Sequence, residues 1–497
     1  MELKSKDKLS LKNTLTGKLD LFEPINREPV GLYHCGPTVY APAHIGNLRP
    51  YVVADVLRRT LEFRGYEVKQ VINVTDVGHL SSDADFGDDK MTKALREKNL
   101  PINLENMKSV GHQYADIFFS DLKFLNIKEP TVTPFASDHI KEDLEIIKNL
   151  EKNGFVYKIS DGLYFDTEKF EEKYPGEYGR LGNVNLAKLQ SGARIKENSE
   201  KKNQSDFALW KFNDDLGYES EYGKGFPGWH LECSAMSRKY LGQPFDIHTG
   251  GVDHIGTHHN NEIAQSKGAY DIDLAKYWMH NAHITMNGKK ISKSTGNYLT
   301  LEDLTKQGIH PLSYRFWLLQ GHYSRPMDFS IEVIHGAQSG LEELIRKIDL
   351  LEFSPEDGSG DQAVWIEAFE KVIFNDLDTP NAISLIYDVL ADKKSSSATR
   401  IELVKIMSGV LGLGLFSLLE DIKDSEIGVL DKQEEYNRKY QEAVLNKTDY
   451  PDDFRQELED KFGMVISTTI KKPDDNQPYF YFKRKNVLEY LTKQIKF

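Results

Sequence analysis

Two cysteines, a histidine and a glutamate are the residues of this chain best suited to binding a metal ion. Cys35 and Cys233 are the only cysteines. In "HHNNEIAQS", His258 and Glu262 stand four positions apart and so share one face of a helix. Two thiolates, an imidazole and an oxygen ligand would form a tetrahedral Zn²⁺ site. The ligands come from three separate segments, however, and isolated cysteines are often buried apolar side chains. His259 is an alternative to the preferred His258.

A second group of residues is suited to binding phosphate. The stretch "HIGN", His44 to Asn47, follows an expected strand and opens an expected helix. Gly46 lets the backbone come close to a ligand, and a helix N-terminus offers free N–H groups to phosphate. His44 could stabilise negative charge in a transition state. Taken alone, the stretch could equally be a turn with a capping polar residue.

A lysine-rich loop lies further along the chain. "NGKKISKSTGN" places Lys290 and Lys293 three positions apart, among serines and with glycine on both sides. Such a cationic, hydroxyl-rich loop is suited to holding a triphosphate while pyrophosphate leaves. A solvated basic turn is the alternative.

Trp229 and Asp253 stand in the part of the sequence richest in histidine, glycine and tryptophan, residues 225–296. The glycines of "HTGGVDHIG" suggest a close approach of backbone and ligand around Asp253. A tight turn with a local side-chain bond is the alternative. The density of these residues predicts a site within this segment.

A parallel sheet is expected to position these groups. "PVGLYHCG" and "YEVKQVINVTDV" are apolar strand candidates. The stretch between them, "NLRPYVVADVLRRTLEFRG", has apolar positions at helical spacing and ends at Gly65, a plausible cap. Strand, helix and strand form a βαβ unit, which predicts a parallel sheet. From about Leu301 onward, four stretches with helical periodicity predict a helix bundle.

Length and charge limit the classes to which the protein can belong. Its 497 residues suffice for about three domains. No apolar run approaches the roughly 18–20 residues that span a bilayer, and the N-terminal stretch lacks the apolar segment of a signal peptide. Two cysteines cannot form a disulfide framework, so we expect a cytoplasmic protein. The net charge of −14 excludes a uniformly nucleic-acid-binding surface but permits local basic patches.

One such patch is expected in the tail. Residues 471–497 hold seven lysines or arginines against three acids, and "YFYFKRK" places aromatic rings beside Lys483, Arg484 and Lys485. Rings and cations together can stack on bases and contact phosphates. The alternative is a basic amphipathic tail that packs on the bundle.

Taken together, these stretches resemble one family. "HIGN" and "KISKS" resemble the HIGH and KMSKS signatures of class I aminoacyl-tRNA synthetases. Six longer blocks resemble cysteinyl-tRNA synthetase in the expected order: "YHCGPTVYAPAHIGN", "PGWHLECSAM", "DIHTGGVDHIGTHHNNEIAQS", "YWMHNAHITMNGKKISKSTGN", "HYSRPMDFS" and "NDLDTPNAISLIYDV". The resemblance extends from about residue 8 to the tail.

The resemblance implies ATP-dependent activation of L-cysteine to cysteinyl-AMP and its transfer to the 3′ end of tRNA(Cys). It implies one zinc ion per subunit, which binds the substrate thiol, Mg²⁺ with ATP, and a monomer. The site residues that it implies are zinc ligands Cys35, Cys233, His258 and Glu262, cysteine-pocket residues Thr75 and Trp229, ATP contacts His44, Gly46, Asn47, Asp253 and Lys293, catalytic His44, Asn47, Lys290 and Lys293, and tRNA contacts Lys483, Arg484 and Lys485.

The resemblance also implies an α/β fold of several domains. A Rossmann-like nucleotide-binding domain with an inserted connective domain would precede an all-α helix bundle and a small C-terminal α+β module. The expected ranges are 1–125 and 225–300 for the two catalytic halves, 126–224 for the connective insertion, 301–340 for a linking segment, 341–425 for the bundle and 426–497 for the anticodon-binding module.

Two departures from the family pattern stand out. The second histidine of the HIGH signature is Asn47, which can donate a hydrogen bond but carries no charge. An insertion of about ten residues, including 81–90, lies beside the expected pocket in "TDVGHLSSDADFGDDK". The closest alternative function is a cysteine ligase that joins activated cysteine to an amino-sugar. A non-catalytic RNA-binding or zinc-storing relative would be expected to lose the lysine loop or the ligands, and neither is lost.

Overall fold

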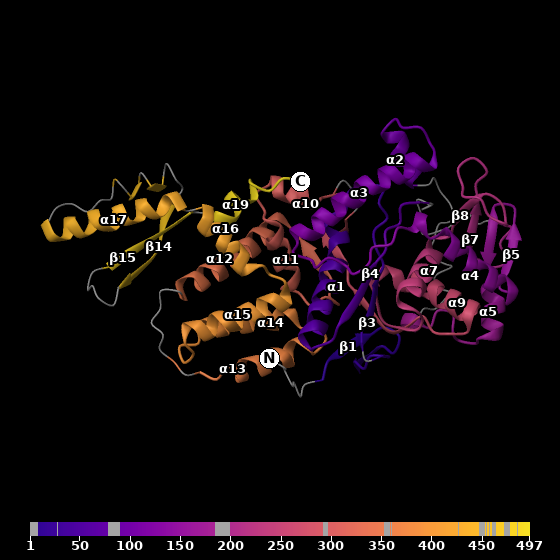
Figure 1. Cartoon of the computed structure of the whole chain (residues 1–497), viewed down its shortest axis with the longest axis horizontal. Helices are drawn as coiled ribbons and strands as arrows, with labels where there is room; N and C mark the ends of the chain where they lie inside the picture. Colours follow the sequence, from indigo (N-terminus) through magenta and orange to yellow (C-terminus); the bar gives the residue numbers. More distant parts are fainter. Residues whose placement is uncertain are drawn as a thin grey trace.

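A four-stranded parallel sheet forms the centre of the molecule (Figure 1). In the order of the sheet, its strands are β10 (Ala275–Asn281), β9 (Phe245–Gly251), β3 (Val30–His34) and β4 (Val68–Ile72). The structure is a computed structural model. It describes residues 8–26, 28–77, 90–183, 199–291, 297–351, 358, 360–425, 427–446, 464–471, 478–484 and 486–497, with five isolated positions between 453 and 459.

The predicted βαβ unit is confirmed. α1 (Ile45–Phe63) connects the parallel strands β3 and β4, and β3 is buried along its whole length. α1 ends where the sequence suggests: Gly65 adopts a positive φ of 98°, and its N–H donates to the carbonyl of Glu62. Glycine suits this position because it takes the left-handed conformation at low cost. The start of α1 therefore lies at the carboxyl edge of the sheet.

A second sheet, antiparallel and also four-stranded, lies at one end of the molecule, at the right in Figure 1. Its strands, in order, are β5 (Val156–Ile159), β6 (Gly162–Phe165), β7 (Phe207–Phe212) and β8 (Gly225–Pro227). α4 (Ile140–Lys152) packs against α7 (Trp229–Leu241) and α9 (His258–Tyr270), which joins this region to the central sheet. β8 begins directly after the expected boundary at residue 224; the division into domains stays a prediction.

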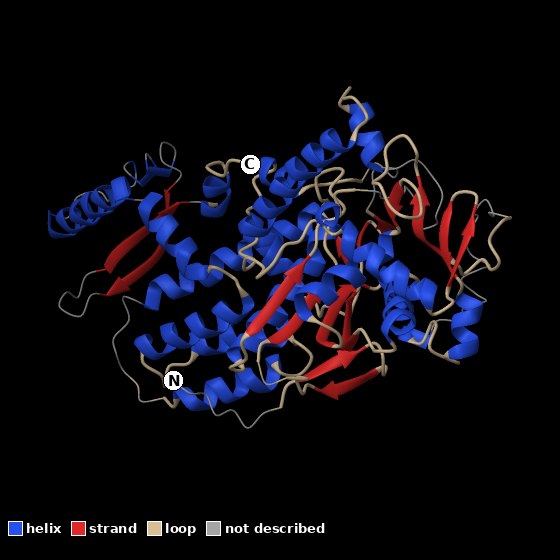
Figure 2. Ribbon diagram, turned by 45° about the vertical axis from the view of Figure 1, so that its right-hand side comes forward, coloured by secondary structure: helices blue, strands red, loops and turns tan. Residues whose placement is uncertain are grey.

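Helices dominate the second half of the chain, as predicted. The bundle consists of α12 (Ile331–Leu351), α13 (Gln362–Ile373), α14 (Thr379–Ala391), α15 (Ser397–Leu411) and α16 (Leu415–Ser425). One continuous apolar core includes residues of this bundle and of α1. Figure 2 shows the strands as separate groups with helices between them.

The C-terminal part lies at the opposite end of the molecule from β5–β8 (Figure 1). It consists of α17 (Ile427–Asn446) and the antiparallel hairpin of β14 (Met464–Lys471) and β15 (Pro478–Arg484). The final helix, α19 (Val487–Thr492), returns to pack against α12 and α16.

The remaining elements are short or peripheral. They are β1 (Ser10–Asn13), β2 (Lys18–Leu21), α2 (Lys90–Glu97), α3 (Leu104–Phe124), η1 (Ala136–Asp138), α5 (Thr167–Lys173), η2 (Leu181–Asn183), α8 (Asp253–Gly256), β11 (Ile284–Met286), β12 (Lys289–Lys290), α10 (Leu301–Lys306), α11 (Pro311–Leu319) and β13 (Met327–Phe329). Within the described residues, no single helix is long and apolar enough to cross a membrane; one pair bent by 110°, Ser397–Leu411 with Leu415–Asp424, passes that test by length and composition only.

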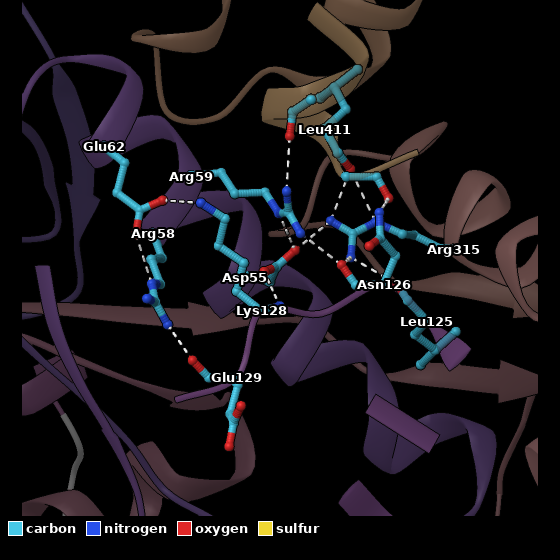
Figure 3. Close-up of polar contacts among 12 residues, drawn as sticks. Asp55, Arg58, Arg59, Glu62, Leu125, Asn126, Lys128, Glu129, Arg315 and Leu411 are labelled. Carbon is cyan, nitrogen blue, oxygen red and sulfur yellow. Dashed lines mark hydrogen bonds and ion pairs between the residues drawn. The ribbon is translucent and has the colours of Figure 1, made fainter. Parts of the chain in front are cut away.

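A buried ion pair joins α11 to α1 beside the bundle (Figure 3). Arg315 of α11 donates to Asp55 of α1 at 2.6 Å, and neither side chain is exposed. Arg59 also donates to Asp55, at 2.8 Å. Arg315 further donates to the carbonyls of Leu411 (2.8 and 3.0 Å), at the end of α15, and Leu125 (2.9 Å), after α3. We call this group the Asp55–Arg315 joint, and it connects α1 to the bundle.

Candidate metal centre and nucleotide pocket

A cavity of about 380 Å³ opens at the carboxyl edge of the parallel sheet. His44, Gly46 and Asn47 line one part of it, and Trp229 and Asp253 line another. Such concave sites at the carboxyl ends of parallel strands are where open α/β sheets bind their ligands. The structure therefore brings together the HIGN stretch, the expected cysteine contact Trp229 and the expected ATP contact Asp253.

The HIGN stretch forms the N-terminus of α1. His44 is the N-cap residue, and its Nδ1 accepts a hydrogen bond from the N–H of Asn47 at 3.3 Å. A Cβ at Gly46 would lie 3.0 Å from the His44 ring, closer than side chains normally pack. The first turn contains no acidic residue. The positive end of the helix dipole is therefore available to an anion in the cavity.

The expected metal ligands meet in one buried cluster. Ligand atoms of Cys35, Cys233, His258 and Glu262 all lie within 4.8 Å of one another. The two sulfurs are 3.9 Å apart and form no disulfide. Tetrahedral Zn–S bonds of about 2.3 Å would place two sulfurs about 3.8 Å apart. Nε2 of His258 lies 3.1 Å from Oε1 of Glu262 without hydrogen-bonding geometry, so both atoms are oriented to share a cation. These residues fit a zinc ion.

Three elements deliver the ligands. Cys35 follows the last residue of β3, Cys233 lies in the second turn of α7, and α9 carries both His258 and Glu262. α7 packs against α9, and Cys35 also lines the cavity. The cluster is therefore joined directly to the pocket through Cys35.

The pKa shifts in the cluster show that it favours positive charge at its centre. Burial alone would lower the pKa of His258, but Cys233 and Glu262 raise it to about 10. Burial would raise the pKa of Glu262, but His248 and His258 lower it to about 2. A hydrogen bond with Cys35 lowers the pKa of Cys233 to about 6, whereas burial holds the pKa of Cys35 well above its usual value.

Further histidines surround the cluster, and none of them was singled out from the sequence apart from His259. His248 contacts Oε2 of Glu262 at 2.9 Å, and Nδ1 of His259 lies 2.8 Å from Nε2 of His280. Nδ1 of His230 lies 2.8 Å from Nδ1 of His258. Outer partners of this kind orient metal ligands. The only sequence signal for these histidines was the high histidine content of residues 225–296, which does not indicate which rings lie next to one another.

A second geometrically possible ligand set shares part of the first. Cys35, His248, His259 and Glu262 also lie within reach of one ion. It contains one thiol, whereas the first set contains both, and thiolates are strong zinc ligands. Burial and the neighbouring histidines hold the pKa of His259 well below its usual value, so it is a neutral ring.

Two of the expected substrate contacts have different surroundings. The Trp229 ring lines the cavity and lies 4.4 Å from the His258 ring, centre to centre. Thr75 is buried, and its hydroxyl donates to Oε2 of Glu232 at 2.7 Å. Thr75 is not among the residues that line the cavity, and its role stays a prediction. Glu232 was not identified from the sequence.

Several predicted site residues fall at or beyond the limits of the described structure. Lys290 is the last residue of β12, and Lys483 and Arg484 are the last two of β15. Lys293 and Lys485 lie outside the described residues, as does most of the 81–90 insertion. Their roles stay predictions.

Comparisons with known proteins agree with this geometry. A family described as "tRNA synthetases class I (C) catalytic domain" matches residues 21–339. A cysteine–tRNA ligase of Treponema denticola is 39% identical over 490 residues, 92% of this chain and 97% of that protein. Cysteine–tRNA ligase 1 of Burkholderia lata is 43% identical over 82% of this chain and 84% of that protein.

The chain belongs to the cysteine–tRNA ligase family. The family resemblance drawn from the sequence is thus confirmed. Solved structures support the fold: methionyl-tRNA synthetase of Mycobacterium tuberculosis with methionyl-adenylate matches at TM-score 0.57, covering 82% of this chain and 94% of that one at 15% identity. A ternary LeuRS–tRNA–LeuAMS complex of Agrobacterium radiobacter K84 agnB2 matches at TM-score 0.58, covering 81% and 86% at 11% identity. The class I synthetase fold is confirmed.

Proposed function

We propose that this protein is a cysteine–tRNA ligase that selects its amino acid through a zinc ion held by Cys35, Cys233, His258 and Glu262. The observation that carries the proposal is the convergence of these four side chains beside a cavity whose other wall is the HIGN turn. The amino acid and the nucleotide would then bind in one pocket. Family membership over most of the chain supports the same activity.

The cluster supplies the selectivity. A zinc ion held by these four residues would favour the thiolate form of the substrate cysteine over a serine hydroxyl, which is a harder and less acidic ligand. The chain's own residues would hold that ion: His248 contacts Oε2 of Glu262, and Cys35 and Cys233 offer two thiols beside it. Trp229 would enclose the rest of the amino acid, and Asp253, in the same cavity, would contact the nucleotide.

The HIGN wall supports the first chemical step. The carboxylate of cysteine attacks the α-phosphorus of Mg·ATP, and the bond from that phosphorus to the bridging oxygen breaks, so pyrophosphate leaves with the electron pair. His44, Asn47 and the α1 N-terminus stabilise negative charge on the phosphates, and Lys290 and Lys293 hold the leaving pyrophosphate. No protein nucleophile is needed, so catalysis consists of positioning and charge stabilisation.

The second step uses tRNA(Cys). A hydroxyl of the terminal ribose attacks the carbonyl carbon, and AMP leaves. The hairpin of β14 and β15 lies at the end of the molecule opposite β5–β8 (Figure 1), which suits one RNA that touches both ends. Lys483, Arg484 and Lys485 then contact the anticodon region. We further propose that the enzyme is monomeric and cytoplasmic; light scattering with and without tRNA tests the first point.

The test is charging of tRNA(Cys) with labelled cysteine by zinc-loaded protein, with metal content measured in the same samples. We expect Cys233→Ser to lose zinc and to lower charging by roughly 10²–10⁴-fold, because a metal ligand supplies several kcal/mol of stabilisation. Ser237→Ala is the matched control. Ser237 is buried one turn further along α7 and bonds only the carbonyl of Ser234 among the described contacts.

Three results would change the proposal. Full charging by Cys233→Ser would remove the zinc argument and keep the ligase. Cysteine-dependent pyrophosphate exchange without tRNA charging would direct attention to an amino-sugar acceptor. Equal use of serine and cysteine by the zinc-loaded protein would show that the cluster does not select the thiol.

A further inference from the structure

Arg49 is a buried cation in the second turn of α1, and its side chain bonds only to the main chain. It is 1% exposed. Nη1 donates to the carbonyls of Ala282 and His283 at 2.8 and 3.0 Å. Nη2 donates to the carbonyls of His322 and Arg325 at 3.3 and 2.7 Å. All four hydrogen bonds recorded for this guanidinium in the described structure thus go to peptide oxygens.

This arrangement is costly and therefore informative. Burying a charge is expensive unless polar groups compensate it, and an arginine most often finds a carboxylate. Four carbonyl dipoles compensate Arg49 instead, and burial lowers its pKa to about 10, which leaves it charged at neutral pH. A neutral apolar residue could fill this volume without that cost. The four hydrogen bonds fix the positions of four peptide carbonyls, which apolar packing could not do.

The four carbonyls belong to two particular turns. Ala282 and His283 directly precede β11, while His322 and Arg325 belong to the turn before β13. β11 and β13 are parallel neighbours, and β11 also pairs with β12 (Lys289–Lys290). One guanidinium therefore fixes the starting points of both parallel strands and, through β11, the hairpin on which Lys290 lies.

One of these two turns, the one before β11, forms a wall of the cavity. Residues 281–284 and Ile291 line it from this side, and His44, Gly46, Asn47 and Pro50 line it from α1. The segment that follows is also attached to α1: the N–H of Ile45 donates to the carbonyl of Leu299 at 2.8 Å. Arg49 does not line the cavity itself, but its side chain connects α1, which forms one wall, to the backbone of the other wall at Ala282 and His283.

We propose that Arg49 is a positioning residue for cysteine activation, which sets the wall formed by residues 281–284 and the β11–β12 hairpin at the correct distance from the HIGN turn. The proposal rests on the proposed function, since the HIGN turn and Lys290 of the hairpin are assigned there to the phosphates of ATP. None of the four hydrogen bonds of Arg49 goes to a metal-ligand candidate. The loss of Arg49 should therefore affect ATP far more than cysteine.

The test compares Arg49→Lys with Arg315→Lys. Both replace a fully buried guanidinium that donates to several carbonyls, and lysine keeps the charge while losing the planar fork. Arg315 belongs to the Asp55–Arg315 joint, and none of the residues to which it donates lines the cavity, whereas Ala282 and His283 do. Steady-state pyrophosphate exchange gives kcat and KM for ATP and for cysteine, with zinc content, thermal midpoint and the Kd for ATP measured in parallel.

We expect Arg49→Lys to lower kcat/KM for ATP by about 10–100-fold, the scale of a misplaced reacting group, with zinc content unchanged and the KM for cysteine within about threefold. Both variants should lower the thermal midpoint of unfolding to a similar extent. The kinetic constants of Arg315→Lys should nevertheless stay within about threefold of the parent protein. Arg49→Gln, which is neutral and keeps two donors, should fall further for ATP than Arg49→Lys.

Three outcomes would overturn the assignment. Arg49→Lys with a lower thermal midpoint but unchanged ATP constants would make Arg49 a structural residue only. Parallel losses for ATP, cysteine and zinc would indicate a general collapse of the site. Unchanged kinetic and binding constants for ATP in all Arg49 variants would also exclude a positioning role for Arg49. Absence of cysteine-dependent exchange in the parent protein would instead refute the proposed function, and the Kd for ATP would still decide the role of Arg49.

Discussion

The metal-ligand cluster and the Asp55–Arg315 joint are both buried groups of ionisable side chains, yet they are built in opposite ways. In the joint, Arg315 bonds Asp55 and three peptide carbonyls, and the backbone N–H of Lys128 donates to Oδ1 of Asp55 at 2.9 Å (Figure 3). Burial would raise the pKa of Asp55, but Arg315 and Arg59 hold it below its usual value. Every charge there is compensated.

In the metal-ligand cluster, several donors and acceptors face one another without completed hydrogen bonds. Nε2 of His258 and Nδ1 of His248 are buried without hydrogen-bond geometry. The pKa values of Cys35 and His258 are shifted strongly upward. Burial of charge in the joint serves to hold elements together, whereas in the cluster it prepares a place for an added cation. Unsatisfied geometry, rather than burial, distinguishes a site from a structural ion pair.

The strongest test of the comparison is Arg315→Met. It leaves the carboxylate of Asp55 buried beside Arg59 alone, and we expect a loss of about 3–5 kcal/mol in the free energy of unfolding. Arg58→Met is the control on the same helix, where the partly exposed ion pair with Glu62 should cost about 1 kcal/mol or less. Denaturant unfolding measures both. Equal losses would show that the joint is no stronger than a surface pair.

Asp121 is a buried carboxylate for which the described residues provide no ion pair like that of Asp55 with Arg315. Burial, with the charge of Glu302, raises its pKa to about 7. The folded state keeps this proton above pH 4, where the unfolded chain loses it, so stability should fall as the pH rises from about 4 to 7. Asp121→Asn removes this dependence.

We therefore expect Asp121→Asn to be more stable than the parent protein by an amount on the order of 2–4 kcal/mol at pH 8 and not at pH 4. Unfolding midpoints across this pH range measure the difference. The same stability gain at both pH values would mean that titration of Asp121 is not its cause.

The smallest expected effect concerns the residues around the cluster. His248→Phe keeps the ring and its stacking position against Trp278 but removes the contact with Glu262. Metal affinity should fall by about 10–100-fold, as for other partners of metal ligands. His139→Phe is the control, since this buried histidine bonds Phe135 and Tyr240 instead. Competition with a chelator measures the affinities; equal values for the two variants would contradict the comparison.

Much of the fold and part of the site could be predicted before the structure. The apolar strands and the amphipathic stretch from Asn47 to Gly65 predicted β3, α1 and β4, because their periodicities are local properties. The i, i+4 spacing of His258 and Glu262 predicted a shared helix face, and the structure brings that face to both cysteines. The hydrogen bond from Thr75 to Glu232 could not be predicted, because 157 positions separate the two residues in the sequence.

The sequence alone determined the element types, the family and the list of residues capable of chemistry, since propensity, periodicity and motif order are encoded along the chain. The tertiary structure decided which histidine rings meet around Glu262. It also decided that Arg49 connects α1 to the turn before β11 and that Arg315 pairs with Asp55. These outcomes depend on contacts across more than 200 positions for Arg49 and Arg315. Burial and pairing are properties of packed surfaces, and no local pattern specifies which polar groups face each other once water is excluded.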